Sequence, residues 1–108
     1  MTRNVRDEIE KEIAENKVLL YVKGTREAPR CGFSARALRI VEGLGVPFKE
    51  IDVLSDPEKW QAVKAYSDWP TIPQVYVGGE FLGGGDQLAE LADKGELEPL
   101  VRKALERT

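Results

Sequence analysis

The sequence predicts an α/β fold in which helices flank one mixed four-stranded sheet. Residues 18–22 form an apolar, β-branched-rich run of strand length, and residues 47–53 alternate apolar and charged side chains, as a second strand does. A stretch with helical spacing separates these strands, so they are expected to run parallel. Residues 74–82 are typical of a β-hairpin, because the central pair Gly78-Gly79 suits the positive φ angles of a two-residue turn.

An amphipathic helix is expected over residues 2–15, where apolar side chains recur four apart and charges fill most other positions. The first strand follows at residues 17–23, and a polar loop over residues 25–30 leads to Cys31. The second helix starts there and runs to about residue 42. The inner face of the first helix is expected to consist of Val5, Ile9 and Ile13, and that of the second of Phe33, Ala37, Ile40, Val41 and Leu44.

The sequence Ser55-Asp56-Pro57-Glu58 predicts the start of a third helix. It combines a Ser or Asp cap, a proline in the first turn and a glutamate three residues after the serine. This helix ends before Trp69-Pro70. The larger aromatic side chains are expected to be packing residues rather than a ligand cage, namely Trp60, Trp69, Tyr21 and Tyr66.

After the hairpin, Asp86 is expected to cap a fourth helix, and a fifth helix is expected over Leu97–Glu106. The side chains expected to face inward are Leu88, Leu91 and Ala92 in the fourth helix and Leu100, Val101, Ala104 and Leu105 in the fifth. This order of elements is the thioredoxin-like arrangement. A chain of 108 residues is long enough for one domain and too short for two ordinary ones, so a single domain over residues 1–108 is expected.

Composition excludes several classes of function. The formal net charge is −3 and no block of one sign occurs, which argues against nucleic acid as a partner. The longest apolar run has only strand length, so no membrane span is expected. The first residues mix both signs and have no apolar signal region, and one cysteine cannot form an internal disulfide. Together these features predict an intracellular, cytoplasmic protein.

Cys31 is the candidate reactive residue. A lone cysteine can instead be an inert packing residue. Its position favours reactivity, because it opens a helix beside Arg30 and within reach of Lys23, and these features stabilise a thiolate. The sequence contains no histidine, so Cys–His and Ser–His catalytic pairs and histidine metal ligands are excluded.

Two further segments have a plain and a functional interpretation. Thr71-Ile72-Pro73-Gln74 is either an ordinary turn before a strand or a cis proline that leaves the backbone of Ile72 free to pair with an extended peptide. Gly83-Gly84-Gly85-Asp86 is either a flexible connection or a helix start whose N–H groups bind a carboxylate. In the functional interpretation, these two segments and Cys31 form one site. Such a site suits a small thiol peptide with a carboxylate at each end.

These motifs, together with Lys23-Gly24-Thr25 and Cys31-Gly32-Phe33-Ser34, resemble the monothiol glutaredoxins of the CGFS type, from about Val5 to Leu105. The resemblance implies a glutaredoxin fold, a glutathione site and a [2Fe-2S] cluster between two subunits. It implies that Lys23 faces glutathione, that Ile72 offers its backbone beside cis Pro73, and that Gly85 and Asp86 bind the γ-glutamyl end. Cys31 is implied to be the catalytic thiolate and the iron ligand.

The cysteine count agrees with a shared cluster. A [2Fe-2S] cluster usually takes four thiolates, and this chain supplies one. Two chains and two glutathione molecules complete the set, so a homodimer through the cluster is expected, acting in iron-sulfur cluster assembly and transfer to acceptor proteins. The resemblance also implies a BolA-like partner. The alternative is a glutathione-dependent thiol-disulfide oxidoreductase that uses Cys31, expected to be weak because the loop over residues 24–30 resembles the extended loop of the CGFS type.

The chain departs from the family pattern at two positions. Family members commonly have a cysteine where this chain has Gly85, and an arginine, which holds a glutathione carboxylate, where it has Trp60. The backbone role at position 85 does not need a side chain. The lost arginine leaves Lys59 or Lys64 as candidates to replace its charge.

Overall fold

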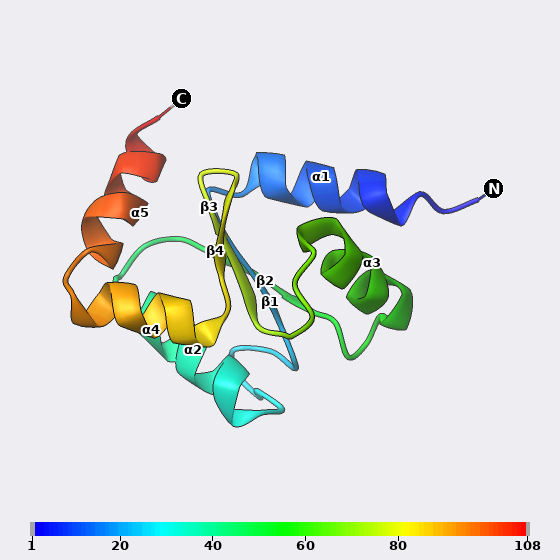
Figure 1. The fold of residues 1–108 in the computed structure, drawn as a ribbon, viewed down its shortest axis with the longest axis horizontal. Coiled ribbons are helices and arrows are strands. Elements are labelled where there is room, and N and C mark those ends of the chain that lie inside the picture. The colour runs from blue at the N-terminus through cyan, green and yellow to red at the C-terminus, as the bar shows by residue number, and fades with distance from the viewer. Residues whose placement is uncertain (1, 108) are drawn as a thin grey trace.

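The computed structural model describes residues 2–107, so the ends of the predicted domain, Met1 and Thr108, lie outside the described residues. Helices flank one four-stranded sheet (Figure 1). Within residues 2–107, no helix combines the length and the apolar character that crossing a bilayer requires. The elements are α1 (Val5–Glu15), β1 (Val18–Val22), α2 (Gly32–Glu42), β2 (Lys49–Asp52), α3 (Pro57–Ser67), β3 (Gln74–Val77), β4 (Glu80–Gly83), α4 (Gly85–Asp93) and α5 (Leu97–Glu106).

The sheet has the strand order β2-β1-β3-β4. Strand β1 pairs in parallel with β2 and antiparallel with β3, and β3 and β4 form the expected hairpin. Gly78 and Gly79 turn the hairpin with φ angles of 60° and 83°, which favour glycine. The predicted mixed four-stranded sheet and its hairpin are therefore confirmed.

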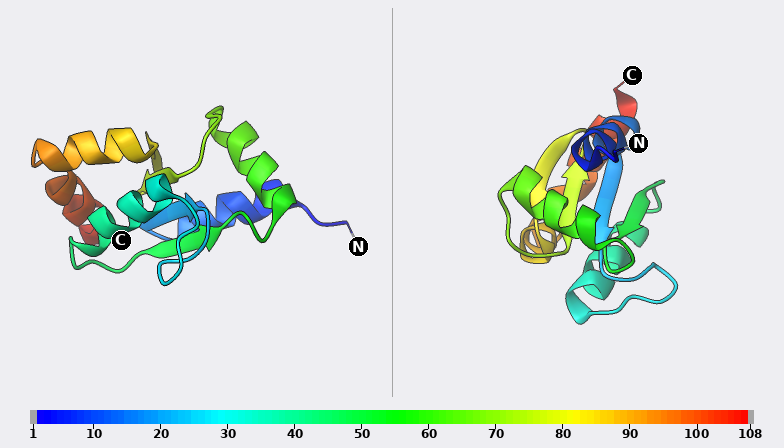
Figure 2. Two further views of the ribbon diagram at one scale, coloured as in Figure 1. Left: turned by 90° about the horizontal axis from the view of Figure 1, so that it is seen from below. Right: turned by 90° about the vertical axis from the view of Figure 1, so that its right-hand side faces the viewer.

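Helices cover both faces of the sheet, and each face has its own hydrophobic core. Helices α1 and α3 lie on one face, and α2, α4 and α5 lie on the other (Figures 1 and 2). Strand β1 is buried throughout and supplies both cores, because successive side chains of a strand point to opposite faces. Leu20 lies in the core under α2, whereas Leu19 and Tyr21 lie in the core under α1 and α3.

Two predicted inner-face residues are wrong. Phe33 is 65% exposed and Leu100 is 36% exposed. Phe33 lies in the first turn of α2, and the buried stripe of that helix starts at Ser34 and includes Leu38. In α5, Leu97, Val101 and Ala104 form the buried stripe, and Leu100 lies on its flank.

One predicted cap is confirmed and one is wrong. Of the two candidates for the cap of α3, Asp56 occupies the position, and its side chain accepts a hydrogen bond from the Lys59 N–H. Ser55 instead donates to the carbonyl of Asp52 at 3.0 Å. Asp86 does not cap α4, because the helix begins one residue earlier and Gly84 occupies the cap position.

A charged network joins α1 to α3. Lys59 is buried, which its sequence position does not reveal, and its ammonium contacts the carboxylates of Glu12 and Glu8. The hydroxyl of Tyr21 donates to Glu12 at 2.8 Å. Arg3 binds Glu8 at 2.6 Å and Asp56 at 2.7 Å, so it connects the start of α1 to the cap of α3.

Arg3→Gln is expected to remove an acid-sensitive part of the stability. Hydrogen bonds from Arg3 lower the pKa of Glu8 from 4.5 to about 2 and that of Asp56 from 3.8 to about 2. Since both folded-state pKa values lie below the unfolded ones, these carboxylates stabilise the fold above about pH 4.5, and the contribution disappears as the pH falls toward about 2. Urea unfolding at several pH values is expected to show the largest difference between variant and wild type near neutrality. Arg6→Gln, which breaks an exposed pair with Glu10, is the control, and a difference that does not change with pH contradicts the expectation.

Candidate functional site

Cys31 occupies the N-cap of α2. Its extended backbone has φ and ψ angles of −151° and 155°, and its sulfur accepts a hydrogen bond from the Ser34 N–H at 3.3 Å. The thiol is free and partly exposed. The predicted placement of the only cysteine at a helix start is thus confirmed, and the sulfur takes the place that a serine or aspartate oxygen has at most helix caps.

The surroundings of Cys31 favour its thiolate. Burial alone raises the pKa of the thiol, but hydrogen bonds from Ser34 and from the Phe33 N–H, together with the charge of Lys23, lower it below its ordinary value. The hydroxyl oxygen of Ser34 lies 3.3 Å from the sulfur and accepts the N–H of Lys23 at 3.0 Å. Because its lone pair already has this donor, the hydroxyl can direct its proton to a sulfur anion.

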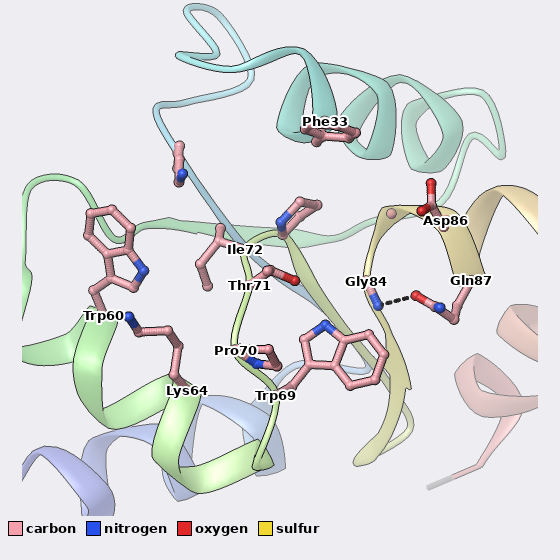
Figure 3. Close-up of a pocket in the computed structure, with 13 residues that line it drawn as sticks. Phe33, Trp60, Lys64, Trp69, Pro70, Thr71, Ile72, Gly84, Asp86 and Gln87 are labelled. Carbon is pink, nitrogen blue, oxygen red and sulfur yellow. Dashed lines mark hydrogen bonds between the residues drawn. The ribbon is translucent and has the colours of Figure 1, made fainter.

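A pocket of about 470 Å³ lies beside this cysteine. Lys23, Ile72, Gly85 and Asp86, the predicted ligand-binding residues, all line it. Cys31 does not line the pocket itself. Phe33, two residues further along the chain, does line it, and Ser34 connects the sulfur of Cys31 to Lys23. Figure 3 shows Trp60 and Lys64 on one side of the pocket, Asp86 and Gln87 on the other, and Ile72 and Thr71 between them.

One end of the pocket is cationic. The ammonium of Lys23 lies 5.1 Å from the centre of the Trp60 ring, and that of Lys64 lies 5.4 Å from it, within the range of cation–π contacts. Among the described residues, neither lysine forms a salt bridge. Two positive charges therefore meet at an aromatic ring with no carboxylate to neutralise them.

The other end of the pocket is the start of α4. The Gly84 N–H donates to the Gln87 side chain at 2.9 Å (Figure 3), whereas the N–H groups of Gly85 and Asp86 have no partner among residues 2–107. The first N–H groups of a helix favour an anion. The Asp86 carboxylate projects beside them and accepts a hydrogen bond from Arg36 at 2.6 Å. This end of the pocket thus offers both N–H donors and a carboxylate.

The segment between the two ends of the pocket presents backbone groups that a ligand can pair with. The Ile72–Pro73 peptide bond is cis, as expected, and neither the N–H nor the C=O of Ile72 has a hydrogen-bond partner within the described chain. The buried side chain of Gln74 donates to the carbonyls of Trp69 and Thr71, which fixes the shape of this segment. The indole N–H of Trp69 is buried without a partner among residues 2–107 and lies in the pocket wall.

Sequence reasoning missed part of this site. Trp60 and Trp69 were expected only to pack, yet both line the pocket. Lys64, one of the two candidate cations, lines the pocket too; it follows Trp60 by four residues, so the helical period places it on the same face of α3. Ser34 stands three residues after Cys31, which is the position from which a first-turn residue reaches the cap.

Comparisons with known proteins agree with this geometry. The sequence model of the glutaredoxin family matches residues 18–82. The chain is 47% identical over 105 residues to an uncharacterised monothiol glutaredoxin of Synechocystis, covering 97% of this chain and 98% of the relative. The chain belongs to the monothiol glutaredoxin family. It is also 51% identical over 87 residues to a probable monothiol glutaredoxin of Legionella pneumophila, covering 81% and 98% of the two chains.

The fold of a monothiol glutaredoxin is confirmed by a solved structure as well. Reduced apo GrxS14 from poplar superimposes with a TM-score of 0.81 at 40% identity, and the match covers 94% of this chain and 93% of the other. The predicted thioredoxin-like architecture is therefore that of a glutaredoxin.

The two departures from the glutaredoxin pattern lie at opposite ends of the pocket. A Cβ atom built on Gly85 lies 3.5 Å from Pro73, 3.6 Å from Arg36 and 3.8 Å from the Phe33 carbonyl, which are ordinary contacts. Position 85 thus has space for a side chain that this chain lacks. At Trp60, the structure decides between the two candidate lysines, because Lys59 is buried against α1 while Lys64 lines the pocket.

Ser34→Ala is expected to raise the pKa of Cys31 toward the ordinary value for a thiol. The variant loses the hydroxyl that stabilises the thiolate but keeps the backbone N–H of residue 34. The pH dependence of alkylation by iodoacetamide, measured on the metal-free protein, reports the pKa directly. Ser67→Ala removes a hydroxyl that donates to Val63 far from the sulfur and is the control. An unchanged alkylation midpoint in Ser34→Ala contradicts the expectation.

Proposed function

We propose that this glutaredoxin binds glutathione in the pocket beside Cys31 and carries a glutathione-ligated [2Fe-2S] cluster between two copies of the chain. The observation that supports it best is the convergence of Lys23, Ile72, Gly85 and Asp86 on one pocket next to a thiol whose pKa is lowered. The proposed role is iron-sulfur cluster assembly and transfer to acceptor proteins.

The charge distribution of the pocket suits glutathione. The peptide carries a carboxylate at its glycine end, and a carboxylate and an ammonium at its γ-glutamyl end. Lys23 and Lys64 would bind the first carboxylate, and the free N–H groups of Gly85 and Asp86 would bind the second. The Asp86 carboxylate would accept the ammonium, and Ile72 would pair with the peptide backbone between the two ends.

The donor set of one chain suits a shared cluster. Among residues 2–107, no three His, Cys, Asp or Glu side chains come together as metal ligands, so Cys31 is the thiolate that the described chain offers. Two chains and two glutathione thiols would complete four ligands. Cys31 is partly exposed at a helix start, where a negatively charged group is stabilised without burial in one chain. The cluster, when bound, supplies transferable iron and sulfide.

Protein reconstituted anaerobically with iron, sulfide and glutathione is expected to be a coloured dimer. Each chain contributes one ligand, so the cluster cannot form on a single copy. Visible absorption combined with the mass in solution measures both properties. Cys31→Ser is expected to stay colourless and monomeric under the same conditions, and omission of glutathione is expected to have the same effect on the wild type.

A colourless monomer of wild-type protein with reduced Cys31 would contradict the cluster proposal.

Deglutathionylation is the second candidate function, favoured by the lowered pKa of an accessible thiol that can form a mixed disulfide with glutathione alone. In that case steady-state turnover of a glutathionylated peptide by the wild type is robust and disappears in Cys31→Ser. Slow turnover together with a coloured dimer favours the carrier.

Trp60→Ala is expected to weaken glutathione binding by about tenfold. The ring holds two ammonium groups at the carboxylate end, and each such contact contributes about 0.5–1 kcal/mol at an exposed site. Trp60→Phe keeps an aromatic face and is expected to retain most of the affinity. Calorimetric titration of the metal-free protein measures the dissociation constant.

Lys64→Met is the companion variant and Lys103→Met, on the remote helix α5, is its control. Removal of one of two cations is expected to lower the affinity for glutathione, whereas the control keeps it. Equal affinities of wild type, Trp60→Ala and Lys64→Met would show that the carboxylate binds elsewhere.

Partners and location complete the proposal. Acceptor proteins and a BolA-like protein would use the face that carries the cluster, so a pull-down with and without the cluster distinguishes them from partners of the free protein. A thiol that must stay reduced suits the cytoplasm.

A further inference from the structure

The loop over residues 24–30 separates the pocket lysine Lys23 from Cys31, and hydrogen bonds at its ends and in its middle fix its shape. At its two ends, the Arg30 N–H donates to the Lys23 carbonyl at 2.8 Å, and Gly24 and Pro29 form an isolated bridge. Gly24 has a φ angle of 92°, and a Cβ atom there would lie 2.5 Å from the Ala28 carbonyl. The loop therefore folds back on itself without free space.

The middle of this loop is attached to the edge strand β2. The guanidinium of Arg26 forms a salt bridge with Glu50, donates to the Phe48 carbonyl at 3.0 Å and lies 3.9 Å from the centre of the Phe48 ring. The backbone N–H of Arg26 also donates to Glu50. Two residues before Arg26, the backbone of the loop is held by the next carboxylate along the strand, since the Gly24 N–H donates to Asp52 at 2.9 Å.

Glu50 is well placed to hold the loop. Its side chain is only 13% exposed, and it faces the same side of β2 as Asp52, because residues two apart in a strand share a face. Burial alone raises the pKa of Glu50, but the hydrogen bonds from Arg26 lower it below its ordinary value. A carboxylate kept charged in a partly buried place requires a fixed partner, and the loop supplies that partner.

Lys23 stands at the junction of these contacts. Its N–H is bound to Ser34 in α2, and its carbonyl accepts the N–H of Arg30, so its backbone is joined directly to the far end of the loop. Its side chain points into the pocket and has no carboxylate partner among the described residues. Displacement of the loop from β2 would therefore change the place of the cation while the sheet stays intact.

We propose that Arg26 and Glu50 are positioning residues, which hold the loop over residues 24–30 against β2 and thereby fix Lys23 at the cationic end of the pocket. The proposal extends the glutathione site proposed above, because the anion that Lys23 binds is expected to be the glutathione carboxylate. Neither residue lines the pocket, so their effect on a ligand must pass through the loop.

Arg26→Met tests this role, because it keeps the aliphatic stem on Phe48 and loses every hydrogen bond of the guanidinium. Amide hydrogen exchange at Lys23 and Arg30 is expected to speed up by about tenfold or more, while Leu20 and Val75 in the sheet exchange as in wild type. The affinity of the metal-free protein for glutathione is expected to fall by about three- to tenfold. Arg26→Lys keeps the charge and is expected to restore part of both properties.

A double-mutant cycle with Glu50→Gln tests whether Arg26 and Glu50 act together. The double variant is expected to bind glutathione about as well as Arg26→Met alone, because Arg26→Met already removes the ion pair with Glu50 and the side-chain carbonyl that Glu50→Gln retains can still accept the backbone N–H of residue 26. Arg102→Met, which breaks the surface pair with Glu98, is the matched control and is expected to change neither property.

The results that overturn the proposal are distinct from those that overturn the glutathione site. Unchanged exchange at Lys23 and Arg30 in Arg26→Met overturns it, as does equal acceleration at Leu20 and Val75, which would indicate a general loss of stability. Faster exchange with unchanged glutathione affinity overturns it too. If the wild type does not bind glutathione, the proposed function fails, and the exchange data still decide whether the pair fixes Lys23.

Discussion

The hydroxyl group of Ser34 connects the fold to the chemistry. It accepts the N–H of Lys23 at the end of β1 and contacts the sulfur of Cys31 at the start of α2. Strand, helix and thiol are therefore fixed relative to one another by a single buried side chain. A second cysteine at this position would be able to form a disulfide with Cys31, whereas serine can only stabilise its thiolate. The thiol is left to react with or bind something outside the chain.

The sheet topology explains why distant segments meet at this thiol. Since β3 runs antiparallel to both β1 and β4, the C-terminal ends of β1 and β4 and the N-terminal end of β3 lie at the same end of the sheet. Lys23 follows β1, Ile72 precedes β3 and Gly84 follows β4, so each enters the pocket from a strand end. Helix α3 adds Trp60 and Lys64 from the side. The pocket is thus a direct consequence of a hairpin placed next to a parallel pair.

The sequence was sufficient for most of this architecture and for the positions of the predicted ligand-binding residues. Strand length, helical spacing and paired glycines are local signals, and they predicted every strand of the sheet. Phe33 and Leu100 were misassigned because apolar spacing does not tell whether a helix face extends beyond the sheet that it covers. The burial of Lys59 was not predicted, because it depends on the carboxylate of Glu12, which is far away in the chain. Arg26 and Glu50 likewise have no sequence signal, since their contact exists only once the loop folds over β2.

Six of the cations discussed above form two groups that have different consequences. Arg3, Arg26, Arg36 and Lys59 each contact a carboxylate, and these pairs hold helices and loops in place. Lys23 and Lys64 instead contact the Trp60 ring, which attracts an ammonium without neutralising its charge. An arginine at position 60 would add a third cation to this end of the pocket, and its repulsion from the lysines would have to be offset by the ligand. Trp60 keeps both lysines at the pocket in the absence of any anion, so the carboxylate of the proposed ligand would meet two cations that are already in place.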